Sequence, residues 1–296
     1  MTKLNYLITT ALLTATSCQT KITMDIQGHR GCRGIMPENT LQAFKKAIDL
    51  NVTTLELDVV LSADQQVVVS HEPWLNYEIT TLPNGDTIKK GDDKKYNLFL
   101  MPYAQIKTYD VGMRQHPRFL QQQKFKAYKP LLIEVFNAVK EKCNFQKKTL
   151  PQFNIEIKST PQDSAYQPTN TQFVNIVMQT ILAANMQNYI TIQSFDYRNL
   201  EIMHNLYPTI KLAMLIDENE KADFDYQIKK LSFIPNIISP HYSLATQNFI
   251  TTAHKNNCKV IPWTVNNLAT ARQLTALKVD GIITDYPNII NANTIY

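Results

Sequence analysis

Carboxylate side chains alternate with apolar ones in two segments of strand length. Glu56 and Asp58 lie two positions apart in the first segment, and Glu156 and Lys158 lie two positions apart in the second. Because side chains alternate along a strand, each pair shares a face. Converging carboxylates have raised pKa values unless a cation neutralises them, and hard oxygen ligands favour Mg²⁺ or Ca²⁺ over zinc. The pattern therefore predicts a site for one divalent cation.

Two histidines and two cationic side chains occupy comparable positions. His29 and His71 each end an apolar run, and two imidazoles can divide proton removal and donation near neutral pH. Arg30 and Lys158 add positive charge that a metal does not require but that a phosphate group does. One metal, two histidines and two cations describe phosphodiester cleavage. The remaining histidines are predicted to be surface or packing residues: His116, His204, His241 and His254.

Strand-length apolar runs recur along the chain, usually followed by a helical pattern. The nine runs are residues 24–29, 53–59, 67–71, 153–157, 190–195, 211–216, 236–240, 260–265 and 281–284. The helical patterns are residues 40–50, 131–142, 171–184, 197–206, 246–256 and 268–278, with a weaker one at 223–231. This alternation predicts a parallel α/β sheet.

The connection at residues 60–66 shows whether all nine apolar runs are parallel strands of one sheet. A parallel crossover needs a dozen or more residues, so this short segment predicts a hairpin return into residues 67–71. Eight βα units remain, which predicts a (β/α)8 TIM-type barrel with its active site at the carboxyl ends of the strands. Residues 72–130 are too long for a connector, and we interpret them as an insertion at the catalytic end that caps the substrate.

An ordered series of short motifs resembles the glycerophosphodiester phosphodiesterase family. The resemblance covers the chain from about residue 24 and implies a (β/α)8 barrel. Two details depart from the family pattern: Glu72 stands where Asp is usual, and the turn before His71 lacks the usual glycine. The motifs are His29-Arg30-Gly31, Pro37-Glu38-Asn39-Thr40, Glu56-Leu57-Asp58, His71, Glu156-Ile157-Lys158, Ser194-Phe195, Trp263-Thr264-Val265-Asn266 and residues 280–285.

The resemblance also implies residue roles. Glu38 alternatively belongs to a helix start that Asn39 or Thr40 caps, and Trp263 alternatively packs in the barrel core. The implied roles are metal binding for Glu56, Asp58 and Glu156, acid–base catalysis for His29 and His71, phosphate binding for Arg30 and Lys158, contact with the glycerol moiety for Trp263, and a metal-proximal position for Glu38.

The predicted activity is metal-dependent hydrolysis of glycerophosphodiesters, such as glycerophosphocholine or glycerophosphoethanolamine, to glycerol 3-phosphate and an alcohol. One alternative is a barrel glycosidase that uses Glu56 and Glu156, which would leave His29, Arg30 and Lys158 without roles. Another is a lipoprotein that binds glycerophosphodiesters without turnover. A degenerate site of that kind would be expected to lack a reacting group, and none is missing.

The amino terminus predicts export. Residues 1–17 contain Lys3 and then an apolar stretch of about 14 residues, too short to span a bilayer. Small residues before Cys18 resemble the bacterial lipobox, in which that cysteine is lipidated. We therefore expect a periplasmic lipoprotein with its catalytic domain at residues 18–296, anchored to the membrane through Cys18 alone. The alternative is a soluble secreted protein.

Composition excludes several classes of protein. The 296 residues are 44% hydrophobic and 19% charged, which excludes intrinsic disorder and an integral membrane protein. The net charge of +5 comes from dispersed Lys and Arg residues, so nucleic-acid binding is not indicated. Apart from Cys18, the three cysteines Cys32, Cys143 and Cys258 allow one disulfide, and no C-x-x-C motif indicates a zinc or redox site.

Overall fold

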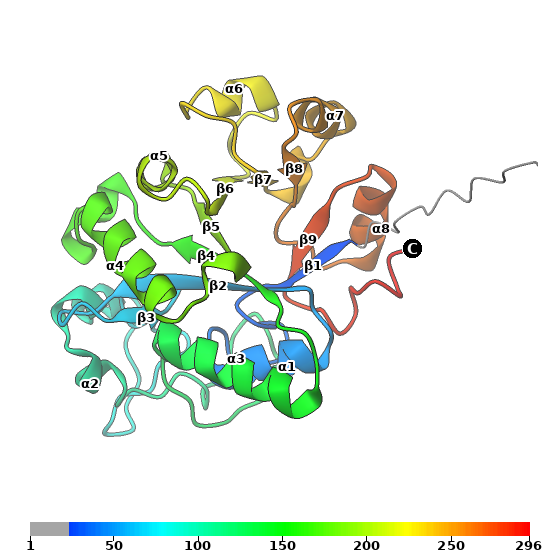
Figure 1. Ribbon diagram of the computed structural model, residues 1–296. Helices are drawn as coiled ribbons and strands as arrows, with labels where there is room; N and C mark the ends of the chain where they lie inside the picture. Colours follow the sequence, from blue (N-terminus) through cyan, green and yellow to red (C-terminus); the bar gives the residue numbers. More distant parts are fainter. Residues whose placement is uncertain (1–23) are drawn as a thin grey trace, which may run out of the picture.

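A ring of parallel strands forms the centre of the protein, as Figure 1 shows for the computed structural model. The structure describes residues 24–296, except for the side chain of Asp163; the predicted signal segment and Cys18 lie outside this range. In the order β8-β7-β6-β5-β4-β2-β1-β9, the ring consists of β8 (Lys259–Val260), β7 (Ile237–Pro240), β6 (Lys211–Ile216), β5 (Ile190–Ser194), β4 (Gln152–Ile157), β2 (Thr54–Leu61), β1 (Asp25–Gly28) and β9 (Gly281–Thr284).

Helices cover the outside of this ring (Figure 1), which confirms the predicted (β/α)8 barrel. They are α1 (Leu41–Asp49), α3 (Leu132–Gln146), α4 (Asn170–Ala183), α5 (Tyr197–Leu206), α6 (Phe224–Ile228), α7 (Gln247–Lys255) and α8 (Leu268–Ala276). Most of them start where the sequence offers a side chain that accepts a hydrogen bond from the first turn. These capping residues are Thr40, Thr169, Asp196, Asp223, Thr246 and Asn267.

The predicted hairpin return is confirmed. Strand β3 (Val67–Val69) pairs antiparallel with β2, and Val60 lies opposite Val68. The turn between them closes with a 3.1 Å hydrogen bond from the Ser62 amide to the Gln66 carbonyl, and Gln65 takes the left-handed conformation with φ 58°. The hairpin ends immediately before His71 and so delivers that histidine to the edge of the barrel.

The last closure of the ring differs from the prediction. The run expected at residues 260–265 forms regular strand only at Lys259–Val260, because Pro262 has no amide hydrogen to donate to a ladder. The ring still closes here through backbone hydrogen bonds, from the Ile283 amide to Pro262 (3.0 Å) and from the Val265 amide to Ile283 (2.9 Å). The irregular segment carries Trp263.

The segment between β3 and α3 builds a core of its own. It contains the 3₁₀ turns η1 (Asp93–Lys95) and η2 (Leu98–Leu100) and the short helix α2 (Tyr103–Ile106), and it packs against Val60 and Val68 of the β2–β3 hairpin. The other 3₁₀ turns are η3 (Pro161–Tyr166), η4 (Gln187–Tyr189) and η5 (Tyr242–Leu244). The buried residues of this second core are Val60, Val68, Leu75, Ile88, Leu98, Met101, Ile106 and Tyr109.

Side chains inside the barrel divide into two halves. Strands β6 to β9 and the segment after β8 contribute an apolar cluster. Strands β1, β2, β4 and β5 contribute buried polar side chains instead. The apolar cluster is Ala213, Ile237, Ile261 and Ile283, and the polar residues include Gln27, Glu56, Asn154 and Gln193.

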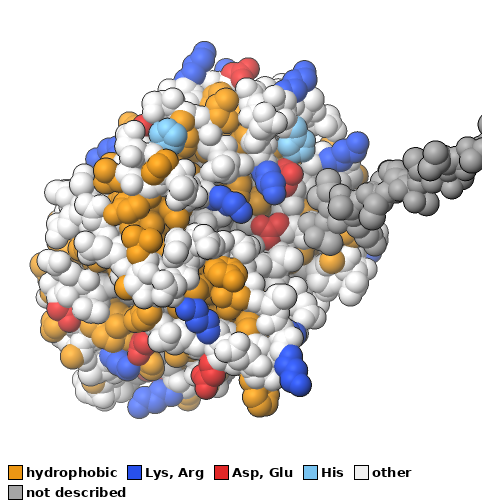
Figure 2. Space-filling model, viewed as in Figure 1, with side chains coloured by type: hydrophobic (Ala, Val, Ile, Leu, Met, Phe, Trp, Pro, Cys, Tyr) orange, Lys and Arg blue, Asp and Glu red, His pale blue; other side chains and the backbone are white. Residues whose placement is uncertain are grey.

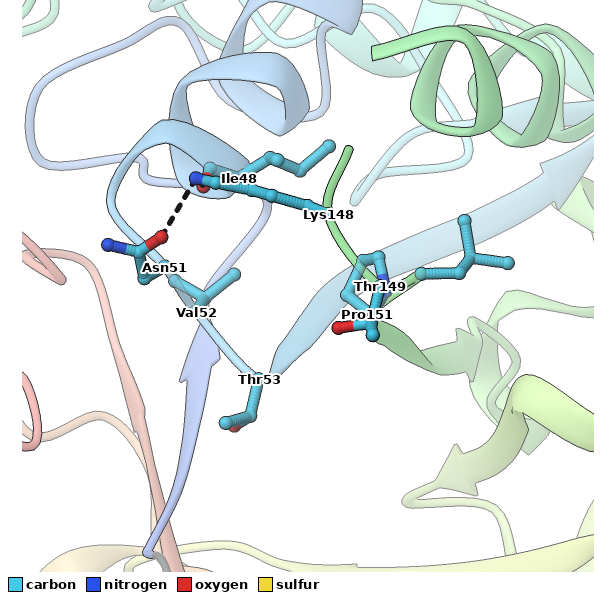
Figure 3. A pocket seen from close by; sticks show the side chains of 8 residues that line it. Ile48, Asn51, Val52, Thr53, Lys148, Thr149 and Pro151 are labelled. Carbon is cyan, nitrogen blue, oxygen red and sulfur yellow. Dashed lines mark hydrogen bonds between the residues drawn. The ribbon is translucent and has the colours of Figure 1, made fainter. Parts of the chain in front are cut away.

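A pocket at the amino-terminal ends of β2 and β4 lies at the opposite end of the barrel from the predicted chemistry (Figure 3). Lys148 donates hydrogen bonds of 2.8 Å to the Ile48 carbonyl and to Asn51 Oδ1. These contacts satisfy a carbonyl at the end of α1 and tie that helix to the loop before β4. The pocket therefore has a structural explanation.

The surface in Figure 2 shows acidic and basic side chains interspersed, with several of both signs near its centre. Within residues 24–296, no helix is long and apolar enough to cross a membrane. Cys32, Cys143 and Cys258 are buried as separate free thiols. Burial raises the pKa of the Cys32 thiol to about 12, which disfavours the reactive thiolate.

Two phenylalanines on α3 test this packing. Phe136 is fully buried and packs edge-on against Phe153, with ring centroids 5.1 Å apart, whereas Phe145 is 85% exposed. We expect Phe136→Ala to lower the free energy of unfolding by about 3–5 kcal/mol and Phe145→Ala to change it by less than about 0.5 kcal/mol. Urea denaturation measures both, and equal losses would contradict the assigned faces of α3.

Candidate active site

Three carboxylates converge at the carboxyl-terminal end of the barrel. The register of the parallel strands β2 and β4 places Asp58 opposite Glu156, and Glu56 precedes Asp58 by two residues on the same face. One carboxylate oxygen from each lies within 4.8 Å of the others. All three side chains are buried, so bulk water cannot screen their mutual repulsion. We call these three residues the carboxylate triad.

The loop after β1 holds the triad in place. The Arg30 amide donates a 2.8 Å hydrogen bond to Glu56 Oε2, and Asn39 Nδ2 donates one of 2.9 Å to Asp58 Oδ2. Gly31 allows the tight path between them, because it adopts φ 86° and a Cβ there would lie 2.8 Å from Ala43.

Arg30 lies between two carboxylates. Its Nη1 donates to Glu38 Oε1 at 2.9 Å, and its Nε lies 3.4 Å from Asp58 Oδ2. Burial raises the pKa of Glu38, but Arg30 and Arg33 more than offset this and lower it to about 2. Glu38 therefore binds the guanidinium groups and is not a member of the triad. Thr40, one of the two predicted caps, caps α1.

The ionised forms of the carboxylate triad require additional positive charge nearby. Burial and the neighbouring Asp58 raise the pKa of Glu56 well above its ordinary value, and burial raises that of Glu156 to about 7. Burial opposes ionisation of Asp58 as well, but His71 and Arg30 lower its pKa. Asp58 Oδ1 is buried without a hydrogen-bond partner. Carboxylates with an unsatisfied oxygen fit a hard divalent cation.

His29 is held by a carboxylate from the other end of the chain. Its Nδ1 lies 2.6 Å from Asp285 Oδ1, which leaves Nε2 directed into the site at 3.9 Å from Glu56 Oε2. Arg33 donates to both oxygens of Asp285, at 2.9 and 3.1 Å. Burial, followed by the charge of Arg33, lowers the pKa of His29 to about 4 although Asp285 opposes this. The neutral imidazole has Nε2 available as a proton acceptor.

His71 has a matching arrangement. Its Nδ1 lies 2.8 Å from Glu72 Oε1, and its Nε2 lies 3.2 Å from Lys158 Nζ. Burial, together with the charges of Arg30 and Lys158, lowers the pKa of His71 well below its ordinary value. Lys158 also binds Glu156 Oε1 at 2.8 Å. Both histidines therefore have one ring nitrogen fixed by a carboxylate and the other directed into the site.

These groups border a cavity of about 400 Å³ whose opposite wall is apolar. Trp263 belongs to that wall, where its ring meets Phe195 edge-on at 5.4 Å and its Nε1 donates to the Ser239 carbonyl at 2.9 Å. Arg118, from the segment between β3 and α3, also lines the cavity. The cavity thus combines a charged wall with an aromatic one.

Several residues of the site had no predicted role. Asp285 directly follows the last strand and Arg33 lies in the loop after β1, so the sequence places both residues at the catalytic end of the barrel. It does not show that they bind each other. Lys129 is buried and donates to Ser70 Oγ at 2.8 Å, and Gln193 donates to Glu56 Oε1 at 2.8 Å. The four remaining histidines contact other side chains: His116 with Phe119, His204 with Phe233, His241 with Trp263, and His254 with Asp280.

Comparisons with known proteins agree with this geometry. Residues 29–289 match the model of the glycerophosphoryl diester phosphodiesterase family. The YhdW protein of Bacillus subtilis is 30% identical over 267 residues, which cover 90% of this chain and 96% of that protein.

Two solved structures have the same fold. A crystal structure from Silicibacter pomeroyi is similar with a TM-score of 0.79 at 26% identity, covering 90% of this chain and 91% of that one. The structure of an Oleispira antarctica phosphodiesterase, in complex with the product sn-glycerol-3-phosphate, is similar with a TM-score of 0.70 at 20% identity, covering 90% and 94%. The chain therefore belongs to the glycerophosphoryl diester phosphodiesterase family, and it is an enzyme that hydrolyses glycerophosphodiesters.

Proposed function

We propose that this enzyme releases glycerol 3-phosphate and an alcohol from glycerophosphodiesters with small head groups, such as glycerophosphocholine, and that it uses one Mg²⁺ or Ca²⁺ ion. The observation that carries this proposal is the charged wall of the cavity, where the carboxylate triad lies beside two cations and two carboxylate-held imidazoles. The product complex of the Oleispira antarctica protein supports the product assignment.

The cation would be held by Glu56, Asp58 and Glu156, and it would neutralise charge that develops on the phosphoryl oxygens. Arg30 and Lys158 lie beside the triad and would bind the remaining phosphate oxygens. The aromatic side chains of Trp263 and Phe195 would pack against the glycerol moiety or the head group. These contacts fix the phosphate at one place in the cavity.

The two histidines would move the protons. One imidazole takes the proton of the glycerol hydroxyl adjacent to the ester, and that oxygen attacks phosphorus. The other imidazole protonates the departing alcohol, and water then opens the cyclic phosphate with the roles reversed. Intramolecular attack benefits from the high effective molarity of a positioned group. Cys32 is not the nucleophile, because it is buried with its Sγ directed to the Ala43 carbonyl.

Removing the divalent cation tests the proposed function. We expect excess chelator to abolish release of glycerol 3-phosphate from glycerophosphocholine while far-ultraviolet circular dichroism stays unchanged, because the barrel core does not depend on the triad. Added Mg²⁺ or Ca²⁺ should restore turnover. Undiminished turnover in protein whose metal content is verified as nil would refute the metal requirement, and absence of turnover with either ion would refute the assigned substrate.

Lys158 is the second test. We expect Lys158→Met to keep the fold but to lower kcat/KM roughly 10- to 100-fold, because a charge-assisted contact to phosphate is worth about 1.5–3 kcal/mol. Lys158→Arg should rescue only part of the loss, since a planar guanidinium does not replace the ammonium near His71 and Glu156. Steady-state kinetics decide the matter: kcat/KM at the wild-type value in the Met variant would show that Lys158 only stabilises the fold.

The attacking oxygen is tested with a modified substrate. We expect an analogue whose glycerol lacks the hydroxyl adjacent to the ester to be cleaved at least about 100-fold more slowly than the parent, because internal attack is then impossible. The parent should also give a transient cyclic phosphate, detectable by phosphorus NMR. Comparable cleavage of analogue and parent would favour direct attack by water.

A further inference from the structure

A chain of buried amide side chains runs through the polar half of the barrel interior. Asn154, on β4, stands at its centre and donates hydrogen bonds in two directions, to Gln27 Oε1 at 2.8 Å and to Gln193 Oε1 at 2.9 Å. Each glutamine donates onward to a carboxylate: Gln27 Nε2 to Asp25 Oδ2 at 2.8 Å, and Gln193 Nε2 to Glu56 Oε1 at 2.8 Å. We call Gln27, Asn154 and Gln193 the amide relay.

The relay has a fixed direction. Asn154 uses its amide nitrogen for both neighbours, so both glutamines must present their oxygens to it and their nitrogens away from it. Gln193 therefore faces Glu56 with a hydrogen-bond donor and not with an acceptor. The Asn154 Oδ1 atom is left buried without a partner. An unsatisfied oxygen costs about 1–3 kcal/mol in a typical buried site. The arrangement nevertheless keeps the oxygens of Gln27 and Gln193 directed towards Asn154.

The position of the relay is also unusual for a barrel. Branched apolar residues dominate the interior of such barrels, as they do on the other side of this one. Gln27, Asn154 and Gln193 are each at most 2% exposed, so their polar groups are almost entirely shielded from bulk water. Packing does not require amides here, because residues of similar volume without polar atoms would fill the same space. Their hydrogen bonds to Glu56 and Asp25 are the property that distinguishes them.

Glu56 differs from the other two triad members in its partners. Glu156 binds the Lys158 ammonium and Asp58 lies beside the Arg30 guanidinium. Among the described residues, Glu56 has no Lys or Arg side-chain nitrogen within 4 Å. Instead, Glu56 Oε1 accepts a hydrogen bond from the side-chain amide of Gln193, and Glu56 Oε2 accepts one from the backbone amide of Arg30. Two neutral donors on opposite oxygens fix the orientation of a carboxylate without cancelling its charge, and each oxygen keeps a lone pair.

We propose that Gln193, oriented by Asn154, is a positioning residue that holds Glu56 as a ligand for the divalent cation. The proposal rests on the proposed function only in that the triad binds such a cation. Partners of metal ligands typically contribute 10- to 100-fold to metal affinity. Asn154 lies opposite Glu56 in the register of β2 and β4 but does not bond to it; its hydrogen bonds go to Gln27 and Gln193, so the orientation of Gln193 is the hydrogen-bonded route by which Asn154 acts on Glu56.

Calorimetric titration of chelator-treated protein with Mg²⁺ or Ca²⁺ alone tests the relay. We expect Gln193→Met, which keeps the volume and removes the donor, to weaken cation binding about 10- to 100-fold. Asn154→Leu should weaken it at least threefold, because it removes the donor that orients Gln193. In steady-state assays the cation concentration for half-maximal activity should rise in parallel, with a smaller change in kcat at saturating cation.

Thr191→Val is the matched control. Thr191 lies two residues before Gln193 on the same face of β5, inside the barrel but outside the relay, and its variant should bind the cation as the wild type does. Wild-type cation affinity in either folded relay variant would overturn the proposal, and so would an equal loss in Thr191→Val. Each relay variant decides by itself if the other fails to fold. A wild-type protein that binds neither ion would instead refute the metal site of the proposed function.

Discussion

Repulsion among buried carboxylates is the constraint to which the rest of the site responds. Glu56, Asp58 and Glu156 lie within 4.8 Å of one another, where burial disfavours their ionised forms. The chain supplies compensation from several elements: a guanidinium from the loop after β1, an ammonium from the end of β4, and neutral amides from the barrel interior. This compensation is incomplete, since Asp58 keeps an oxygen without a partner. A site of this kind could hold a cation, because its own charges are only partly balanced.

The division of the barrel interior explains how one cavity offers two kinds of wall. The chain up to residue 194 provides β1, β2, β4 and β5, whose inward side chains are polar, and the chain from residue 211 on provides the apolar cluster beneath Trp263. A phosphodiester combines a charged centre with carbon-bearing groups on both sides. In the proposed function, the charged wall would hold the first and the aromatic wall the second, so the order of the strands would set the orientation of the substrate.

Much of this was predictable from local patterns. Alternation along residues 54–59 placed Glu56 and Asp58 on one face, and the short connection after residue 59 identified the hairpin that carries His71. The pairing of Arg33 with Asp285 was not predictable, because it depends on closure of the ring and involves residues 252 positions apart. The irregular closure at Pro262 was missed for a local reason, since apolar residues on both sides concealed the missing amide hydrogen. Alternation reveals which face a residue occupies but not which residue it meets across the barrel.

The bond between His29 and Asp285 joins residues 256 positions apart and therefore sets an order of events during synthesis. A ribosome completes the triad, Lys158 and the hairpin when little more than half of the chain has emerged. His29 has no orienting carboxylate until Asp285 has been added after the last strand. A nascent chain therefore contains the triad and Lys158 long before His29 is held in its final orientation. With the acid–base role proposed for His29, the enzyme would become competent only when its two ends meet, and a chain interrupted late in translation would remain inactive even with the three triad carboxylates in place.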